Sequence, residues 1–531
     1  MAAMARIRSG RSVLGAVAVV AAVAPLGLTG PARAQEPAAG PQATWTVQDV
    51  APGVQVRTGT IRDASAAPSW TVTVKDPGTS RLTGAAVDVE VGPQAWAQQT
   101  AAQLTGAGYR PRVETVAWPD YADTPHGAMG QRVRIGSYAT QAQAQSVASA
   151  IAATGFHTAV EWTGYDAEQP ADVENVHVAV IDPHRFTGTV EGTHDGSVTQ
   201  RETTSAVAAK LGSLVGVNAG FFVTSDSDGV QGIPSGLAAY DGEVASMAAG
   251  ARTALVLSDG GRHVRIARLT STATARAGGS SYAVQGINRL PGTVRDCGRP
   301  GATPSALPWQ DVTCHESDDL VLFTPAFGAA LPGGAGTQVM LDGHGRVVSV
   351  GARGGSVPAG GSVLQGIGAA ADWLTAHAVP GQRVDVRDTV RDTAGRQVRL
   401  GAGDSVVSAA PTLVADGRIA IDAAAEGTVD PQDLSFGYAW ANVRQPRTMA
   451  GIDARGRLLL VTVDGRLTGG SEGFTISEAA HFMRSLGAVQ AMNLDGGGST
   501  AFTVGGTLLN HPSDATGERA VGDTIEVLPG H

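Results

Sequence analysis

The polar residues best placed to do chemistry gather near the end of the chain, in MNLDGGGSTAF (residues 492–502). A short apolar strand there runs into three glycines, and four polar residues surround them: Asn493, Asp495, Ser499 and Thr500. Glycine costs about 0.5–1 kcal/mol relative to alanine inside regular structure, so three in succession indicate a tight turn or the close approach of another group to the main chain. The segment is therefore either a simple turn or part of a binding site.

A second polar loop, Asp464-Gly465-Arg466, follows the apolar run LLLVTV. We predict that its strand (456–465) and the strand of the glycine loop neighbour each other in parallel around a helix at 476–486. The carboxyl ends of parallel strands lie at one edge of a sheet, so the two loops would emerge together. Read alone, VDGR and LDGGG are also ordinary turn sequences.

Two carboxylates, an arginine and a glycine loop suit an anionic, sugar-like substrate. Arginine binds phosphate or carboxylate with a bidentate fork, and consecutive glycines can turn backbone N–H groups toward an anion. A pair of carboxylates can supply the nucleophile and the acid/base of glycoside cleavage. Ser499 lacks the Gly-x-Ser-x-Gly frame of a serine hydrolase. Glu478 fits a capping box with Thr475 better than it fits a catalytic role.

The elements that would position these loops are mostly strands. From about residue 173 onward, short apolar or alternating runs stand between Gly and Asp turns, with few helices. We predict an α+β protein, with a large β-rich catalytic domain containing embedded helices over 173–530 and a small βαββαβ domain over 80–164. A β segment at 44–79 is assigned to the catalytic domain, and QEPAAGPQA (35–43) is assigned to a flexible leader.

The small domain is predicted from a weak internal repeat, in which AWAQQTAAQLTGAGYRPRVETV (95–116) is echoed at 142–163. Each copy is a helical stretch that ends at Gly, and we expect strands before the helices at 85–92 and 131–138. The stretch RVRIGSYATQAQAQSVASAIAATGFHTAVEW resembles the SPOR domain. That resemblance implies a ferredoxin-like module that binds peptidoglycan glycan strands through residues 80–164; a generic βαβ repeat without a ligand is the alternative.

Four separated motifs resemble the phosphodiester glycosidase family in sequence and order. They are VNAGFF (217–222), PRTMAGIDARGRLLLVTVDGR (446–466), FTISEAAHFMRSLGAVQAMNLDGGGSTAF (474–502), and HPSD with ERAV (511–521). This family includes the uncovering enzyme, N-acetylglucosamine-1-phosphodiester alpha-N-acetylglucosaminidase. The resemblance implies hydrolysis of a sugar-1-phosphodiester at the anomeric carbon, with no required cofactor and with the need for a divalent cation left open.

The same resemblance implies roles for individual residues. Asp495 is expected to attack or stabilise the anomeric centre, Asp464 to act as the acid/base or to orient water, and Arg466 to hold the phosphate. Substrate contacts are expected from a larger set: Asn218, Arg447, Thr448, Asn493, Gly496, Gly497, Gly498, Ser499 and Thr500. Within that set, Arg447 would also hold phosphate. Asn218 and Asn493 would bind sugar hydroxyls or the acetamido group.

The start of the chain predicts the compartment. Three arginines precede an apolar run (13–28), and small residues follow at 32–34. This is the layout of a secretory signal peptide over 1–34, with an uncleaved anchor as the alternative. We therefore expect a secreted, cell-wall-associated protein.

The two cysteines, Cys297 and Cys314, are expected to form one disulfide outside the cytoplasm. No second Cys/His cluster follows, so no metal site is predicted. The run TSDSDG (224–229) could hold a cation loosely, but it is more simply a polar turn. A formal net charge of −10 argues against nucleic acid or an anionic membrane surface as a partner.

The leading hypothesis is a secreted glycosidase that acts on phosphodiester-linked sugars and is held at the wall by its SPOR-like module. Two alternatives stay open at this point. The protein could be a non-catalytic envelope protein that binds glycan, or a phosphodiesterase that cuts the P–O bond. The sequence does not specify the sugar, the aglycone, the stereochemical outcome or the oligomeric state.

Overall fold

The computed structural model describes residues 42–194 and 196–530. The predicted signal peptide (1–34) and nearly all of the predicted leader (35–43) lie outside the described residues. Within the described part of the chain, the helices are all too short or too polar to cross a membrane.

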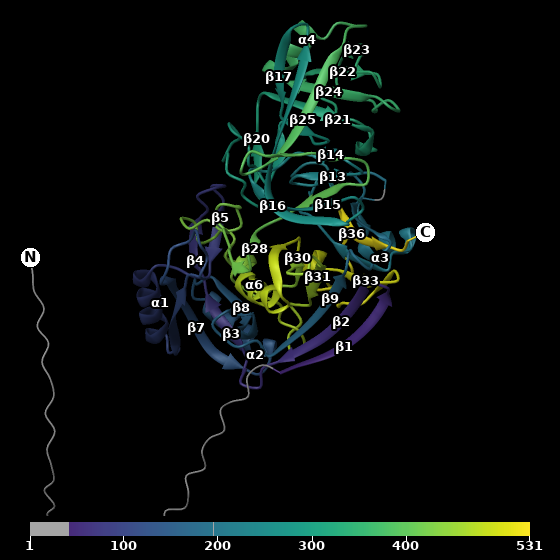
Figure 1. The fold of residues 1–531 in the computed structure, drawn as a ribbon. Helices are drawn as coiled ribbons and strands as arrows, with labels where there is room; N and C mark the ends of the chain where they lie inside the picture. Colours follow the sequence, from purple (N-terminus) through teal and green to yellow (C-terminus); the bar gives the residue numbers. More distant parts are fainter. Residues whose placement is uncertain (1–41, 195, 531) are drawn as a thin grey trace, which may run out of the picture. The chain divides into compact units, whose positions relative to one another are not determined.

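An eight-stranded antiparallel sheet carries the two polar loops (Figure 1). Its strands, in spatial order, are β1 (Gln42–Ala51), β2 (Val54–Arg62), β9 (Val173–Ile181), β31 (Leu458–Val463), β30 (Arg447–Asp453), β32 (Ala488–Asn493), β28 (Thr412–Ala415) and β29 (Arg418–Ile419). The three strands β9, β31 and β30 are buried along almost their whole length. Their long apolar runs follow from this position, because both faces of the sheet are covered.

Helix α6 (Ile476–Ser485) packs against one face of this sheet, where Met483 contacts the cluster around Val461. Its capping box is confirmed: the Thr475 hydroxyl accepts from the N–H of Glu478 at 3.1 Å, and the Glu478 carboxylate accepts from the N–H of Thr475 at 2.9 Å. The interpretation of Glu478 as a cap is therefore correct, and the helix is fixed in register with the loops around it.

A five-stranded sheet covers the opposite face. It contains β10 (Thr189–Thr193), β36 (Thr524–Leu528), β12 (Val215–Asn218), β33 (Phe502–Val504) and β34 (Thr507–Leu508). Side chains from both sheets, such as Leu460, Val217 and Ile525, form one core cluster between them. The end of β12 and the start of β33 therefore lie over the same region of the large sheet.

The predicted parallel arrangement of β31 and β32 is right in direction and wrong in adjacency. Each strand pairs antiparallel with β30, which lies between them. Two strands antiparallel to the same neighbour run parallel to each other, so their carboxyl ends share one edge of the sheet. The intervening strand brings its own first residues, Arg447 and Thr448, to that edge.

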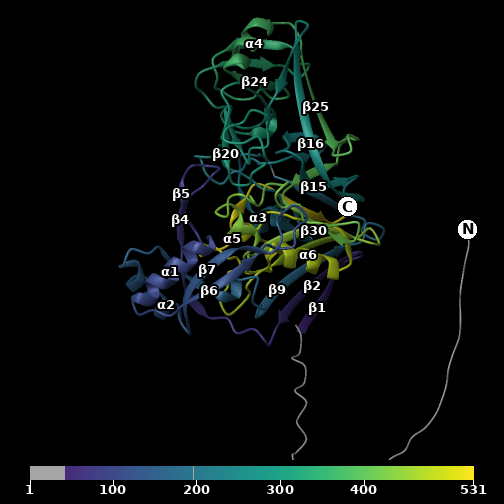
Figure 2. The ribbon, with the colours of Figure 1, turned by 90° about the vertical axis from the view of Figure 1, so that its left-hand side faces the viewer.

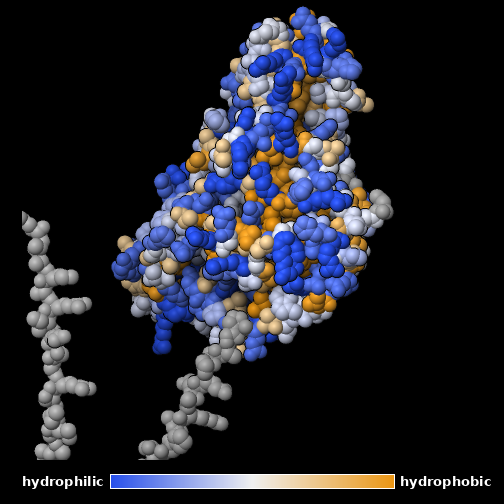
Figure 3. Space-filling model, in the orientation of Figure 1, coloured by the Kyte–Doolittle hydropathy of each residue, from blue (hydrophilic) through white to orange (hydrophobic). Residues whose placement is uncertain are grey.

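Two further sheets form the part of the protein drawn in teal and green at the top of Figure 1. The first contains β14 (Glu243–Ser246), β13 (Ala238–Tyr240), β27 (Ser405–Ser408), β15 (Arg252–Ser258), β16 (His263–Ala277), β25 (Val384–Asp392) and β26 (Gln397–Val398), with β17 (Ser280–Val284) beside β16. The second contains β18 (Gly286–Ile287), β21 (Asp319–Phe323), β24 (Ser362–Ile367), β22 (Thr337–Leu341) and β23 (Val347–Gly351), and α4 (Ala369–His377) packs on it. Figure 3 shows apolar residues reaching the surface along the centre of the face drawn, over the region of β15 and β30.

The small domain has the predicted succession of elements, and we refer to it as the βαββαβ module. It contains β3 (Trp70–Val74), α1 (Gln94–Gly106), β6 (Pro111–Ala117), β7 (Ala128–Tyr138), α2 (Gln141–Ala152) and β8 (Thr158–Trp162), with the strands in the order β6–β7–β3–β8. Both helices pack on one face of this sheet, through a core that includes Val72, Leu104 and Ile151 (Figure 2).

Two boundary predictions for this module were wrong. The first strand is β3, whereas residues 85–92 contain β5 (Ala86–Val89), which pairs with β4 (Asp76–Thr79) in a separate hairpin. The 44–79 segment is accordingly divided, because β1 and β2 join the large sheet and β3 joins the module. The alternating pattern marks each of these as a strand, but it does not carry information on which sheet the strand enters.

The second face of the module's sheet is polar and buried. Arg132 and Arg134 project from this face and are 3% and 2% exposed. Both bind the carboxylate of Asp166, and Arg132 also binds Glu90 at 2.9 Å. The side chain of Tyr438, which begins helix α5 (Tyr438–Ala441) outside the module, lies close enough to interact with Arg132. This sheet face is therefore packed inside the protein.

Candidate active site

The structure brings the predicted polar residues to one edge of the large sheet. Asp464 follows β31 directly, and Asp495 lies two residues after β32. Asn218 ends β12 above them, and its side-chain N–H donates to the Asp495 carbonyl at 2.7 Å. The backbone N–H of Asp495 donates to the carbonyl of Ala219 at 2.9 Å. The glycine loop is thus fastened to the second sheet on both sides of Asp495.

Asp495 is a partly buried carboxyl whose pKa is strongly raised. Burial raises the pKa of Asp495 to about 7, against the opposing effects of the Ser499 hydroxyl and of the Gly496 N–H, which donates to the carboxylate at 2.9 Å. The negative charge of Asp311 raises this pKa further, whereas Arg519 lowers it. A carboxyl group that holds its proton near neutral pH is suited to acid/base chemistry rather than to nucleophilic attack.

The three glycines make room for protein groups. A Cβ atom on Gly496 would lie 2.9 Å from the carbonyl of Pro446, and one on Gly497 would lie 3.2 Å from the Arg466 guanidinium. A Cβ on Gly498 would lie only 2.1 Å from the Arg519 guanidinium. Gly497 also has φ +61°, which favours glycine. Gly496 thus leaves room for the main chain of Pro446, and Gly497 and Gly498 leave room for two arginine head groups.

The backbone N–H groups of Gly496 and Gly497 are already engaged within the protein. The N–H of Gly496 is used by Asp495, and the N–H of Gly497 donates to the carbonyl of Pro446 at 2.9 Å. The expectation that these N–H groups face an anion is therefore not met for either residue. Arg466 and Arg519 instead present two guanidinium groups over the loop, and such groups bind phosphate oxygens in pairs.

The two arginines are held in different ways. Arg519 forms a two-point ion pair with Asp514, through Nε to Oδ2 at 2.8 Å and Nη2 to Oδ1 at 3.1 Å. Arg466 is exposed, has φ +58°, and donates from Nε to the Gln445 side chain. Asp514 attracts the Arg466 guanidinium, whereas the nearby like charge of Arg519 repels it. An anion bound between the two guanidinium groups would relieve that repulsion.

Asp464 lies at the same edge of the large sheet, directly after β31, and is fully buried. It accepts a hydrogen bond from the backbone N–H of His511 at 3.2 Å, and its other oxygen lies 3.3 Å from the His511 ring. The Nε2 atom of His177, from β9, lies 3.8 Å from the carboxylate, and neither ring nitrogen of His177 makes a hydrogen bond among the described residues. Asp464 is thus a carboxylate placed between two imidazoles.

Four predicted substrate contacts form the support beneath the site. Thr448 donates to the Asn218 side chain at 2.6 Å, and Asn493 donates to the carbonyl of Ala410 at 2.9 Å. The guanidinium of Arg447 is fully buried, donates to the carbonyl of Phe474 at 2.8 Å and lies 4.8 Å from the centre of the Trp440 ring. The structure therefore gives Arg447 a supporting position, whereas Arg466 and Arg519 are the arginines whose guanidinium groups lie on the glycine loop.

Burial lowers the pKa of Arg447 to about 9, which fits this enclosed position. The Ser499 and Thr500 side chains lie at the end of the glycine loop and are both buried. Ser499 interacts with the Asp495 carboxyl. The Ser499 hydroxyl nevertheless makes no hydrogen bond among the described residues.

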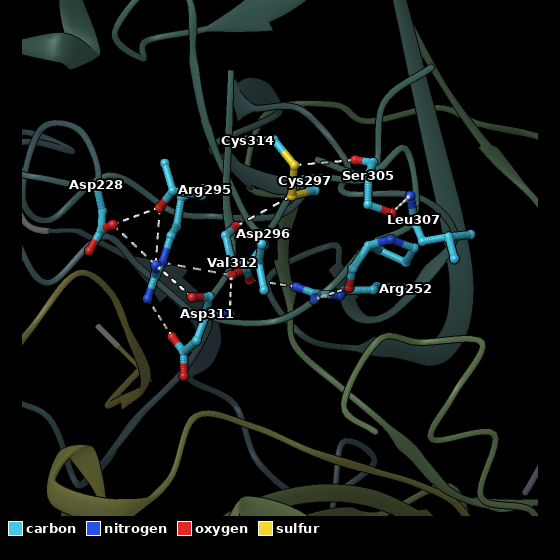
Figure 4. The surroundings of a disulfide bond; sticks show 12 residues. Asp228, Arg252, Arg295, Asp296, Cys297, Ser305, Leu307, Asp311, Val312 and Cys314 are labelled. Carbon is cyan, nitrogen blue, oxygen red and sulfur yellow. Dashed lines mark hydrogen bonds and ion pairs between the residues drawn. A yellow bond between two sulfur atoms is a disulfide. The ribbon is translucent and has the colours of Figure 1, made fainter. Parts of the chain in front are cut away.

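The predicted disulfide between Cys297 and Cys314 is confirmed, with the sulfur atoms 2.00 Å apart. Figure 4 shows that the Asp311 carboxylate points away from the disulfide and toward Arg295, whose Nη2 donates to it at 2.7 Å. The backbone N–H of Asp311 donates to the buried carboxylate of Asp296 at 2.8 Å. Asp311 is therefore held by Arg295 and Asp296, although its side chain is 71% exposed.

Sequence reasoning missed several members of this site. Arg519, Asp514 and His511 lie in the HPSD and ERAV motifs, which signalled their importance without giving a role. His177 stands in the alternating strand VENVHVAVI, where only its polarity at a buried position was a signal. Asp311 gave no such signal, because nothing in the sequence connects the loop between the two cysteines with Asp495.

No group of three or more His, Cys, Asp or Glu side chains that could hold a metal is found among residues 42–194 and 196–530. In the run 224–229, the Asp228 carboxylate accepts from the Thr313 hydroxyl at 2.6 Å and lies 3.3 Å from Arg295. The Asp226 carboxylate accepts from Gln231 at 2.9 Å. Both carboxylates of this turn therefore have protein partners.

The chain resembles known proteins in sequence and in structure. Residues 335–528 match the sequence profile of the family described as phosphodiester glycosidase. N-acetylglucosamine-1-phosphodiester alpha-N-acetylglucosaminidase of Mus musculus is 36% identical over 103 residues, which is 19% of this chain and 20% of that protein. The SPbeta prophage-derived protein YomE of Bacillus subtilis is 41% identical over 90 residues, or 17% of this chain and 14% of that protein.

A crystal structure of a protein from Burkholderia pseudomallei K96243 is 34% identical, covers 92% of this chain and 97% of that chain, and superimposes with a TM-score of 0.79. The chain spans about a fifth of the length of the mouse and Bos taurus proteins that it matches. The range matched by the family profile contains both carboxylates and both arginines described above. The matched part of the chain, residues 335–528, therefore belongs to the phosphodiester glycosidase family.

Proposed function

We propose that this protein hydrolyses the bond between C1 of a sugar and the bridging oxygen of a phosphodiester, releasing free sugar and a phosphomonoester. A sugar of the N-acetylglucosamine type is the proposed substrate, as the name of the mouse relative states for that protein. The observation that carries the proposal is the placement of Asp495 beside Arg466 and Arg519 on the glycine loop. A proton donor and an anion-binding pair are what this cleavage needs at one end of the bond.

We propose roles for the two carboxylates that differ in part from those expected from the sequence. Asp495, with its raised pKa, is the better proton donor to the departing phosphate. The second pKa of a phosphomonoester is about 6, so the donor and the acceptor are closely matched. Asp464, which receives a hydrogen bond from the His511 N–H, is the better carboxylate to stabilise the anomeric centre or to orient water.

The arginines would act on the phosphate as the C1–O bond breaks. A diester carries one negative charge and the departing monoester carries up to two, so two guanidinium groups interact more strongly with the product-like transition state than with the substrate. Arg519 is held by Asp514 and Arg466 is held by its loop, so both positive charges are in place before the C1–O bond breaks. This difference in charge is the proposed source of rate acceleration.

The test is hydrolysis of α-N-acetylglucosamine 1-(methyl phosphate) in H₂¹⁸O, with product analysis by mass spectrometry. Cleavage at C1 is expected to leave the methyl phosphate free of ¹⁸O. Incorporation of ¹⁸O into the phosphate would show P–O cleavage and support the phosphodiesterase alternative instead. A panel of other sugar-1-phosphodiesters without any product would support the non-catalytic alternative.

We also propose that the protein acts outside the cytoplasm on exported or cell-wall glycans. The Cys297–Cys314 disulfide supports this, because structural disulfides persist in oxidising compartments. Peptidoglycan is the proposed partner of the βαββαβ module. Since the polar face of its sheet is buried, the exposed glutamines of α1, such as Gln98, Gln99 and Gln103, are the surface offered for such binding. Sedimentation of the protein with purified cell-wall sacculi tests this, and unchanged recovery in the supernatant would refute it.

A further inference from the structure

The segment that leaves the βαββαβ module lies against the loop that carries Arg466. We call residues 162–172 the exit segment and residues 464–473 the Arg466 loop. The exit segment runs from the last residue of β8 to the start of β9 and contains the short 3-10 helix Thr163–Tyr165. The two segments are separated by about 300 residues of sequence, and they contact each other through both side chains and backbone.

Glu472, which is buried, is the main link between the two segments. Its Oε1 accepts from the indole N–H of Trp162 at 3.0 Å, and its Oε2 accepts from the backbone N–H of Asp172 at 2.8 Å. The carbonyl of Glu472 accepts from the backbone N–H of Arg466 at 3.4 Å. The exit segment therefore holds both carboxylate oxygens of the residue that closes the Arg466 loop.

A second contact holds the tip of the loop. The Tyr165 hydroxyl lies 3.0 Å from the Thr468 hydroxyl, and Tyr165 is close enough to interact electrostatically with Arg466. Arg466 has φ +58°. A non-glycine residue persists in this left-handed region only where surrounding contacts fix it.

The fit between the two segments is tight. A Cβ atom on Gly164 would lie 1.8 Å from Oε1 of Glu472, so this carboxylate packs directly against the glycine backbone. On its other side the exit segment is bound by Arg444, whose guanidinium donates to the carbonyls of Gly164 and Asp166, both at 2.8 Å. The exit segment is thus fixed from two directions.

We propose that Trp162 and Tyr165 are positioning residues for Arg466, so that the βαββαβ module is a working part of the active site. Neither residue is assigned a contact with the reacting atoms. Trp162 acts through Glu472 on the backbone of Arg466, and Tyr165 acts through Thr468 on the same loop. The inference rests on the phosphate-binding role given to Arg466 under the proposed function.

The test measures binding of glycerol 2-phosphate, a phosphomonoester probe, by isothermal titration calorimetry, which needs no turnover. Trp162→Phe keeps an aromatic ring against Trp70 and removes only the N–H donor. Tyr165→Phe removes only the hydroxyl. Each is expected to raise Kd by about 3- to 10-fold, the effect of one lost hydrogen bond. The matched control is Trp373→Phe in α4. It removes an indole N–H that donates to the Ser280 hydroxyl at 2.9 Å, and it should leave Kd unchanged.

The same substitutions are then made in an Arg466→Ala background. Positioning through Arg466 requires that Trp162→Phe has no further effect there, and an equal loss in both backgrounds would overturn the inference. If Trp162→Phe fails to fold, Gly164→Ala displaces the Glu472 carboxylate instead and should weaken binding in the same way. An unchanged Kd in Trp162→Phe and Tyr165→Phe would also overturn it.

These outcomes are separable from those of the proposed function. If wild-type protein releases free sugar but the variants bind the probe normally, the positioning role is refuted and the proposed function stands. If wild-type protein cleaves no C1–O bond but binds the probe in an Arg466-dependent way that Trp162→Phe weakens, the positioning role stands alone. Failure of wild-type protein to bind the probe would refute the phosphate role of Arg466 and the inference together.

Discussion

Substitution of Asp495 by Asn should remove activity and at the same time make the folded protein more stable at alkaline pH. The pKa of Asp495 is raised from 3.8 to about 7 by burial, so the folded protein keeps this proton to a higher pH than the unfolded chain does. The stabilisation that accompanies the proton is complete below about pH 4 and is lost as the pH rises through 7. Asn is neutral throughout and does not suffer this loss.

The size of the effect follows from the shift. A difference of about three units corresponds to about 4 kcal/mol at pH 8, since one unit is worth about 1.4 kcal/mol. Asp495 is partly reachable by solvent, so this figure is an upper bound. The Asn side-chain oxygen can still accept from the Gly496 N–H. We expect Asp495→Asn to exceed wild type by about 2–4 kcal/mol in unfolding free energy at pH 8, and to match it at pH 4.

The assay is urea denaturation followed by tryptophan fluorescence at pH 4, 6 and 8, together with kcat for free-sugar release. Loss of a general acid is expected to lower kcat by about 10²- to 10⁴-fold. Asp453→Asn is the matched control, for which the change in unfolding free energy at pH 8 should have the opposite sign. Although burial alone would raise the pKa of Asp453, the N–H groups and guanidinium of Arg457 and the N–H of Arg455 lower it.

Asp453→Asn should therefore lose stability at pH 8 and less at pH 4. The reasoning is refuted if Asp495→Asn is less stable than wild type at pH 8, because the carboxylate would then be stabilised by its surroundings. Retention of wild-type kcat in Asp495→Asn would refute the role of this residue as acid independently of the stability result.

Further predictions follow from the same geometry. Arg519→Met should raise KM for the diester by about 10- to 100-fold through loss of charged hydrogen bonds, and an unchanged KM would contradict its place in the anion site. The wild-type pH profile of kcat/KM should fall as the pH rises through about 7, and Asp311→Asn should move this limb to lower pH, since a nearby negative charge is removed; no movement would show that Asp311 does not act on Asp495. Replacing Cys297 and Cys314 by Ser should lower the unfolding free energy by about 3 kcal/mol in urea denaturation, and an unchanged value would contradict the loop constraint. Arg447→Met should cost stability and leave KM nearly unchanged, whereas a raised KM at full stability would return Arg447 to the substrate site.

The sequence alone determined the local features of this protein. The capping box at Thr475 and Glu478 and the apolar strands on both sides of α6 could be predicted because they depend on residue types at short spacing. A strand, helix and strand in that order place both strand ends at one sheet edge, so the order of elements along the chain was enough to predict that Asp464 and Asp495 lie at the same edge. With only two cysteines, the disulfide had a single pairing available.

Only the tertiary structure decided which polar groups face a ligand and which support the fold. Arg447 and Arg519 are both arginines in motifs of the same family, yet one is enclosed by backbone carbonyls and the other lies on the glycine loop. Likewise, β1 and β3 both read as alternating strands, but they enter different sheets. A sequence pattern indicates which residues of a short segment are buried. The partner that causes burial comes from distant segments, so packing between segments about 300 residues apart fixed the positions of Trp162, Glu472 and Arg466.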